Sequence, residues 1–371
     1  MGLNLQVCGL NYRHAKITCS VEASIMSVMS SSRVLSEEIE KASAKDTRPD
    51  VGFVACIERG ELEPQALLLF ESIRSYTGRF RDCAIYALSP RAGYAISENA
   101  RRKLDELGVN YIDAVLNTEF PENGPANRVA AAAYIEEKHP HEILVILDSD
   151  TLFLREPNAI LLRPDVDVAV RPEACKGMGT TGPTDPFDGY WRDLCRCCGV
   201  DYEQIPWTES FADRRRIKAY YNGGLAIVRG KLGIMQRWAD FFFASLRQQL
   251  VPFPEDRRVR SGAGWQDPGV GRTWGSDQAV LSLAIWSTTR QVQELEPTYN
   301  YSLLVHNSVE PERRDRIFPH LVHVHYHFML HEDSVSKNPL FDESGPLSPE
   351  QRAWLSHGYK RLQGGRVKLF A

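Results

Sequence analysis

The 371-residue sequence lacks the signatures of membrane proteins, of dinucleotide-binding domains and of nucleic-acid-binding proteins. No uninterrupted apolar run is long enough to span a bilayer, and no basic-then-apolar signal peptide opens the chain, so we expect a cytoplasmic protein without an integral membrane segment. No Gly-x-Gly-x-x-Gly and no Gly-x-x-x-x-Gly-Lys-Ser/Thr loop follows the first predicted strand, which argues against a Rossmann dehydrogenase and a P-loop NTPase. The formal net charge of −4 gives no reason to expect a nucleic-acid partner.

The cysteines do not form a zinc-finger pattern. Eight are present, and Cys195 and Cys198 form one Cys-x-x-Cys spacing without a second pair at zinc-finger distance. Free thiols at a helix end are the favoured interpretation of this spacing, and a structural zinc or redox site is the alternative. Cys56 and Cys83 lie within apolar runs, where a cysteine behaves as a small buried hydrophobe.

Short apolar runs alternate with segments of helical periodicity in the first half of the chain. The runs predict strands at 51–57, 83–88 and 109–112 and helices at 61–77, 91–107 and 125–138. Such alternation is typical of an α/β domain with a doubly wound, mostly parallel sheet. Residues 1–49 lack this pattern, and we expect an N-terminal arm there that is partly helical, around 32–44, or disordered.

The second half is less regular. It predicts strands at 166–171, 219–228, 291–295 and 321–329 and helices at 231–250, 275–287 and 348–362, the last with Ser348 as its N-cap. Residues 172–218 read as a long irregular stretch that contains Trp191 and Trp207. Residues 252–272 are rich in Gly, Pro and Arg, which predicts either a disordered loop or a lid that orders on ligand binding.

Two carboxylates end the most apolar strand of the sequence. The run 142–147 reads as a buried strand, and Asp148 and Asp150 follow it directly, one residue apart. Open α/β sheets bind ligands at the carboxyl ends of their strands. Two acidic groups so close are costly without a cation, and Mg²⁺ or Mn²⁺ commonly bridges carboxylates to substrate phosphates. The pair therefore predicts a divalent-cation site that faces a phosphate group; a helix cap beside a solvated Asp is the plain alternative.

Four motifs in a fixed order resemble those of one enzyme family. They are Asp148-Ser149-Asp150, Tyr221-Asn222-Gly223-Gly224-Leu225, Ser276-Asp277-Gln278 and His323-Val324-His325-Tyr326-His327. This set is similar to the Asp-x-Asp motif, the Asn-Gly-Gly segment, the Asp-Gln pair and the C-terminal metal-binding histidine of GT-A glycosyltransferases. Within this class the set resembles the glycogenin and lipopolysaccharide galactosyltransferase-like group, and the similarity extends from about residue 51 to about residue 330.

The resemblance implies a GT-A type α/β fold. Its doubly wound, mixed and mostly parallel sheet is flanked by helices, and a Rossmann-like nucleotide-binding half is fused to an acceptor half. We expect the glycosyltransferase domain at 50–332, with the nucleotide-sugar half at 50–155 and the acceptor half at 156–332. Residues 333–371 would form a C-terminal extension with a terminal helix.

The resemblance also implies a function and a set of site residues. The expected activity is metal-dependent, hexosyltransferase-like transfer from a nucleoside-diphosphate sugar, with UDP as the expected nucleotide, to an unidentified acceptor. The ion, Mn²⁺ or Mg²⁺, would be held by Asp148, Asp150 and His325, with His327 or His323 as alternatives to His325. Asp277 and Asn222 are the expected catalytic or sugar-positioning residues, with Asp277 as the base if transfer inverts the anomeric centre. The expected nucleotide-sugar contacts are Ala55, Cys56, Ile57, Arg128, Asp148, Ser149, Gly223, Gly224 and Gln278.

The sequence departs from the family after His327. The Gly-x-x-Lys-Pro-Trp segment of the family is absent, and Lys337 is the candidate to replace its diphosphate-binding lysine. The candidate sugar-stacking side chains are Trp191, Trp207, Trp265 and Trp274, although tryptophan is as often a core residue.

Other functions stay open at this point. A metal-dependent hydrolase could use the alternating histidines, which would share one face of a strand, although no repeated β/α pattern of an eight-stranded barrel precedes them. A non-catalytic sugar-nucleotide-binding module of the same fold is the other alternative. A row of solvated edge-strand histidines is the plain alternative to a metal site.

Overall fold

The computed structural model describes residues 49–330 and 338–366. Its first half follows the predicted alternation closely, because each apolar run is short and bounded by turn residues or a helix cap. The elements are β1 (Val51–Cys56), α2 (Leu62–Tyr76), β2 (Ala84–Ser89), α3 (Glu98–Glu106), β3 (Asn110–Asp113), α4 (Gly124–Lys138) and β4 (Ile143–Leu147). Helix α3 begins seven residues later than predicted, because the Ser97 hydroxyl caps it by accepting the backbone N–H of Ala100.

The second half contains more secondary structure than its sequence predicts. The elements up to residue 247 are β5 (Thr151–Phe153), β6 (Val168–Pro172), α5 (Asp188–Cys198), β7 (Trp207–Glu209), β8 (Arg216–Lys218), β9 (Tyr221–Arg229) and α6 (Ile234–Arg247). Those that follow are β10 (Arg260–Ser261), β11 (Gly264–Trp265), α7 (Pro268–Gly271), α8 (Ser276–Thr288), β12 (Val292–Glu294), β13 (Tyr301–Ser302), α9 (Pro311–Ile317), β14 (His323–His325) and α10 (Pro349–Arg366).

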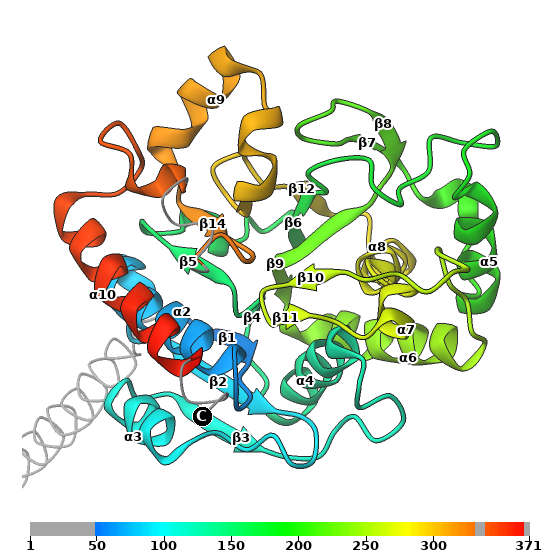
Figure 1. Cartoon of the computed structure of the whole chain (residues 1–371). Helices are drawn as coiled ribbons and strands as arrows, with labels where there is room; N and C mark the ends of the chain where they lie inside the picture. The colour runs from blue at the N-terminus through cyan, green and yellow to red at the C-terminus, as the bar shows by residue number, and fades with distance from the viewer. Residues whose placement is uncertain (1–48, 331–337, 367–371) are drawn as a thin grey trace, which may run out of the picture. The chain divides into compact units, whose positions relative to one another are not determined.

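Seven strands form the main sheet, in the order β12-β6-β9-β4-β1-β2-β3 (Figure 1). Every neighbouring pair is parallel except the two that involve β9, which runs antiparallel to β4 and to β6. The mixed, mostly parallel α/β sheet predicted from the sequence is therefore confirmed. Because β4 and β1 are parallel neighbours, the acidic residues after β4 lie at the same edge of the sheet as the end of β1.

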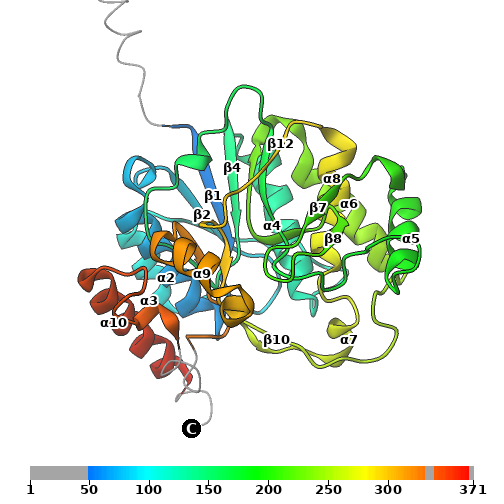
Figure 2. The same cartoon turned by 90° about the horizontal axis from the view of Figure 1, so that it is seen from above.

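Helices cover both faces of this sheet (Figure 2). Alternate residues along each strand face opposite sides: Val54 and Ile146 pack in the cluster that includes α4, α6 and α8, whereas Phe53 and Val145 pack in the cluster with α2 and α3. This division follows from the two-residue period of a strand. Among the described helices, none combines the length and apolar character that a bilayer crossing requires.

A second sheet places the histidine segment beside the acidic turn. It has the order β13-β14-β5, and β14 pairs antiparallel with β5 so that His325 lies opposite Thr151. The chain enters β5 directly from β4, with only the Asp148–Asp150 turn between the two strands. The two sheets therefore meet at this turn, and residues from both reach the same point.

Two predictions of secondary structure were wrong in extent. The stretch 172–218 was predicted to be irregular, but it contains helix α5 and the β7–β8 hairpin. The predicted strand 321–329 is only His323–His325, because the chain turns after it: the backbone N–H of Met329 bonds to Tyr326 O, and His327 adopts a left-handed φ of 53°.

The C-terminal helix begins as predicted. The backbone N–H of Gln351 donates to the Ser348 hydroxyl at 3.2 Å, and Gln351 Oε1 accepts the backbone N–H of Ser348 at 2.9 Å. The predicted N-terminal arm and Lys337 lie outside the described residues. The predicted division of the chain into three parts stays a prediction.

Candidate functional site

The Asp148–Asp150 turn is fixed on three sides by hydrogen bonds to other strands. The backbone N–H of Asp148 donates to Gly224 O at 3.2 Å, and the Ser149 hydroxyl donates to Cys56 O at 2.6 Å. The carbonyl oxygen of Asp150 accepts the backbone N–H of Tyr326 at 3.1 Å. These bonds hold both carboxylates at the carboxyl edge of β1 and β4, where the sequence predicted them.

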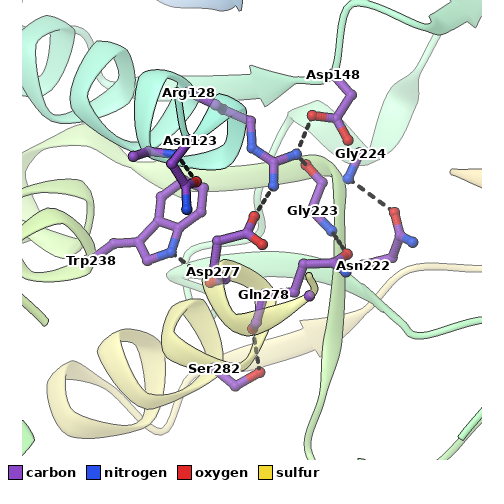
Figure 3. A network of polar contacts seen from close by, with 12 residues as sticks. Asn123, Arg128, Asp148, Asn222, Gly223, Gly224, Trp238, Asp277, Gln278 and Ser282 are labelled. Carbon is purple, nitrogen blue, oxygen red and sulfur yellow. Dashed lines mark hydrogen bonds and ion pairs between the residues drawn. The ribbon is translucent and has the colours of Figure 1, made fainter. Parts of the chain in front are cut away.

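Arg128 joins two of the predicted acidic residues (Figure 3). Its guanidinium forms ion pairs with Asp148 and with Asp277, and it donates a further hydrogen bond to Gly223 O at 3.0 Å. The arginine side chain is 12% exposed and that of Asp277 is 3% exposed, so water screens this network little. Burial lowers the pKa of Arg128, but the two carboxylates outweigh that effect and raise it. The arginine is therefore a fixed positive charge between two acids.

Trp238 of α6 contacts both Arg128 and Asp277. Its indole N–H donates to Asp277 O at 2.7 Å, and its ring lies 5.6 Å from the Arg128 guanidinium carbon. Asp277 itself lies in the first turn of α8, where a negative charge is favourable. The next residue, Gln278, accepts the backbone N–H of Gly223 at 2.7 Å and so ties the helix to β9.

Asp150 converges with two histidines. His325 Nε2 lies 3.2 Å from Asp150 Oδ1 and 3.8 Å from Asp148 Oδ2. The rings of His325 and His327 are stacked, with centroids 3.7 Å apart. One ligand atom from each of Asp150, His325 and His327 lies within 4.8 Å of the others, and no other group of three such residues in the described chain is as close. A carboxylate with two imidazoles is a donor set that suits a divalent metal ion.

The electrostatics of the two acids differ. For Asp150, burial raises the pKa, but the charge and hydrogen bond of His325 outweigh it, so the pKa is lowered. For Asp148, burial dominates over the attraction of Arg128, so the pKa is raised. Burial and the charge of His325 lower the pKa of His327 to about 3, which leaves its imidazole neutral, the form that binds metals.

His323 lies apart from this group. It is fully buried, its ring centroid lies 4.6 Å from that of Phe153, and burial holds its pKa well below the usual value. Neither ring nitrogen has a hydrogen-bond partner among the described residues. Of the three histidines considered from the sequence, the structure therefore brings His325 and His327 to the acidic turn and leaves His323 in the core.

Asn222 links the histidine to a further acid. Its Oδ1 lies 3.3 Å from His325 Nδ1 and accepts from the backbone N–H of Gly224 and from Asn300 Nδ2, at 2.9 and 2.8 Å. Its Nδ2 donates to Glu173 Oε2 at 2.7 Å. The side chain of Asn222 thus orients other groups of the site.

The two glycines after Asn222 are required by close packing. A Cβ on Gly223 would lie 2.6 Å from an Arg128 guanidinium nitrogen, and a Cβ on Gly224 would lie 2.5 Å from His325 Nδ1. Any side chain at either position would displace a residue of the site. The Asn-Gly-Gly segment therefore has a structural explanation beyond an ordinary turn.

Glu173 was not among the site residues predicted from the sequence. It follows β6 directly, and burial raises its pKa to about 7, with smaller opposing effects from the Asn222 hydrogen bond and the charge of His325. A carboxyl group that titrates near neutral pH beside Asn222 is suited to exchange a proton with a hydroxyl group. The available signal was its position after a strand end, the same signal that identified Asp148.

The β10–β11 hairpin lies over the acidic turn. A Cβ on Gly262 would lie 2.4 Å from Asp150 Oδ2, and Gly262 O accepts a hydrogen bond from the Gln65 side chain of α2. Trp265 of this hairpin is 62% exposed, with the Arg258 guanidinium 5.2 Å from its ring. Residues 252–272 therefore reach the site, and Trp265 presents an open aromatic face.

Two other candidate tryptophans differ in their exposure. Trp207 is 39% exposed, but Trp191 is fully buried and donates to Met178 O, so the prediction that Trp191 could stack on a sugar is wrong. Residues 55–57, at and just after the end of β1, are buried beside the acidic turn. The described cysteines are free, and the Cys195–Cys198 segment of α5 belongs to no group of three potential metal ligands.

A mixed α/β sheet with an Asp-Ser-Asp turn at its carboxyl edge is the arrangement that the resemblance to glycosyltransferases led us to expect. The family model of the Rhodobacterales glycosyltransferase domain matches residues 53–257, more than half of the chain, and the protein belongs to this family. No curated protein matches the sequence.

Several solved structures are similar to this chain at low identity. Galactosyltransferase LgtC, in complex with donor and acceptor sugar analogs, is 15% identical over 85% of this chain and 95% of its own, with a TM-score of 0.43. The glycosyltransferase GlyE of Streptococcus pneumoniae TIGR4 is 12% identical over 85% of this chain and 62% of its own, with a TM-score of 0.42. The bifunctional glycosyltransferase WbbM is 13% identical over 76% and 46%, with a TM-score of 0.41.

Proposed function

We propose that this glycosyltransferase is metal-dependent and moves a sugar from a nucleoside-diphosphate sugar, with UDP as the first nucleotide to test, to an acceptor hydroxyl group. The convergence of Asp150 with His325 and His327 at the carboxyl edge of the sheet carries the proposal. Arg128, which forms an ion pair with Asp277, also forms an ion pair with Asp148 of the same acidic turn.

Residues of the acidic turn and of β14 would hold the ion. Asp150 and His325 are the nearest pair, and Mn²⁺ or Mg²⁺ is the expected ion. When bound, such an ion stabilises the negative charge that develops on a diphosphate leaving group. Asp148 is the second acidic candidate for the ion or for a donor hydroxyl, and it also fixes Arg128.

The remaining polar residues would orient the two sugars. Arg128 offers its charge to the diphosphate or donor sugar, and Asp277 holds that arginine in place. Asp277 would act as base if transfer inverts the anomeric centre and would position the sugar if it retains it. Glu173, with its pKa near 7, is an added candidate to accept the proton of the acceptor hydroxyl. Residues 55–57, together with Ser149, would line the nucleotide pocket.

The experiment is a panel of nucleotide sugars incubated with Mn²⁺ and assayed for release of nucleoside diphosphate by hydrolysis, which needs no acceptor. We expect release from one or a few donors, and loss of at least 99% of it in Asp150→Asn. The matched control is Asp165→Asn, an aspartate of an exposed ion pair with Arg163. Equal activity of Asp150→Asn and the control would refute the proposal. Donor binding without any release would instead favour a non-catalytic binding module.

A further inference from the structure

Arg171 is a buried cation that lacks a charged partner. It lies near the end of β6, and its side chain is only 7% exposed. Its Nη2 has no hydrogen-bond partner, and among the described residues its guanidinium forms neither a hydrogen bond nor an ion pair. Burial of a charge is costly unless the charge is paired and hydrogen-bonded, so an unpaired arginine at this depth requires an explanation.

A second arginine lies against the same aromatic ring. The guanidinium carbon of Arg171 is 4.6 Å from the ring centroid of Phe211, and that of Arg313 in α9 is 4.4 Å from it. Arg313 also donates a hydrogen bond to Phe211 O. Burial and, to a smaller extent, the charge of Arg313 lower the pKa of Arg171 to about 10. The aromatic ring attracts both cations, but it carries no full negative charge that could compensate them.

The nearest carboxylates have other partners. Glu173 Oε2 accepts a hydrogen bond from Asn222 Nδ2 at 2.7 Å, and Glu294 Oε1 accepts one from the Thr208 hydroxyl. Both carboxylates act on Arg171 only through their charge, which opposes the lowering of its pKa. The described part of the chain therefore brings two cations together and places no anion in contact with Arg171.

The two arginines lie near Asn222 and away from the expected nucleotide pocket. Arg171 is the cross-strand partner of Asn222 in β9, and the backbone N–H of Phe211 donates to Glu173 O at 3.1 Å. In the main sheet, β9 and β4 lie between β6 and β1, and the end of β1 is expected to line the nucleotide pocket. Three strand spacings, about 14 Å in total, thus separate β6 from β1. A ligand of these arginines would therefore lie apart from the nucleotide, on the acceptor side.

We propose that Arg171 and Arg313 form a binding site for an oxyanion, the phosphate or carboxylate group of an anionic acceptor. Guanidinium groups bind such groups through paired N–H donors, and clusters of arginines are a common site of their recognition. The oxyanion would supply the charge and the hydrogen bonds that Arg171 lacks. The assignment of this group to the acceptor rests on the proposed transferase function, whereas binding of the anion does not.

The test measures anion binding by the full-length protein without metal or nucleotide sugar. Sulfate, as a probe of phosphate-like groups, and acetate, as a probe of carboxylates, are titrated separately by calorimetry at constant ionic strength in chloride. We expect one saturable site per chain for at least one of them, and the ion that binds more tightly indicates which group the acceptor carries. Absence of a saturable site for both ions would overturn the proposal.

Three variants identify the residues that bind the anion. Arg171→Met and Arg313→Met should each weaken binding at least tenfold, because each removes a charged donor. The matched control is Arg163→Met, an arginine of an exposed ion pair with Asp165, and it should change affinity less than twofold. Unchanged binding in either Arg171→Met or Arg313→Met would refute the proposal.

Thermal unfolding in anion-free buffer distinguishes binding from a structural role of Arg171. Replacement of buried charges by apolar side chains is often neutral or stabilising, so Arg171→Met should lower the melting temperature by no more than about 2 °C. A larger decrease would mean that Arg171 is compensated within the protein, which contradicts the proposal. Arg313→Met supplies the binding test independently if Arg171→Met does not fold.

A competition experiment separates this site from the donor site. The affinity for the tighter-binding anion should change less than twofold when UDP and Mn²⁺ are present at saturating concentrations. Competition between UDP and the anion would place the arginines in the donor site and overturn their assignment to the acceptor. If the protein binds no UDP, the proposed function fails in its nucleotide, whereas the titration without nucleotide still decides whether the oxyanion site exists.

Discussion

Removal of the positive charge of Arg128 should cost a large part of the stability of the protein. The substitution Arg128→Met keeps an unbranched side chain, removes the guanidinium together with its contact over Trp238, and leaves Asp148 and Asp277 facing each other without a cation. The arginine is 12% exposed, and its two partners are 25% and 3% exposed. Breaking a buried ion pair by removing one partner typically costs about 3–5 kcal/mol, because the remaining charge is left uncompensated.

This free energy can be converted into a melting temperature. About 310 residues are described, and unfolding entropy is about 2.1 cal/mol/K per residue, so 3–5 kcal/mol corresponds to a decrease of about 5–8 °C. The assay is thermal unfolding followed by circular dichroism, without added metal. The destabilisation should shrink as the pH is lowered, because protonation of Asp148, whose pKa is raised by burial, relieves the repulsion.

An exposed arginine provides the matched control. Arg79 pairs with Glu156 at 2.6 Å, and the two side chains are 52% and 33% exposed. Ion pairs in water contribute about 0–1 kcal/mol, so Arg79→Met should lower the melting temperature by no more than about 2 °C. If Arg128→Met is as stable as Arg79→Met at neutral pH, the assignment of Arg128 as the cation that two buried acids require is wrong.

Two further predictions concern the packing and the titration of the site. Gly224→Ala should destabilise the protein by about 1–3 kcal/mol in urea unfolding, because its Cβ would lie 2.5 Å from His325 Nδ1. Gly189→Ala, where a Cβ meets nothing within 4 Å, is the control and should not destabilise the protein. Burial raises the pKa of Glu173 from 4.5 to about 7, so the folded state holds a proton that the unfolded chain has released between these values. Its contribution to the free energy of unfolding should therefore fall by up to about 3 kcal/mol as pH rises from 4.5 to 7. Glu173→Gln should lack this decline, and parallel stability–pH curves of the two proteins would contradict the assignment.

The elements that could be predicted are those specified by local sequence. Asp148 and Asp150 follow an apolar run directly, so their position at a strand end needed no knowledge of the rest of the fold. The same holds for Asp277, which opens a helix, and for Ser348, whose hydroxyl caps one. In contrast, α5 was missed because the surrounding glycines, prolines and tryptophans conceal the periodicity of its eleven residues.

The detailed contacts between these elements could not be predicted from local sequence, because they depend on distant parts of the chain. Arg128 and Asp277 are 149 residues apart, and nothing in either segment indicates the other. The approach of His327 to His325 depends on a single backbone angle, whereas the alternating pattern predicted a continuous strand with all three histidines on one face. Glu173 is one acidic residue after one strand, and only the structure shows that Asn222 connects it to the site.

The positions of Asp150 and His325 along the chain have a thermodynamic consequence. They are about 175 residues apart, yet their side chains meet at 3.2 Å. An ion bound to both residues would cross-link them and close a loop of nearly half the protein. The entropy lost on closing a loop grows with the length of the loop. An ion at 100 times its dissociation constant would add about 2.7 kcal/mol to the free energy of unfolding. The supply of the ion would then govern how long the folded enzyme persists, as well as how fast it works.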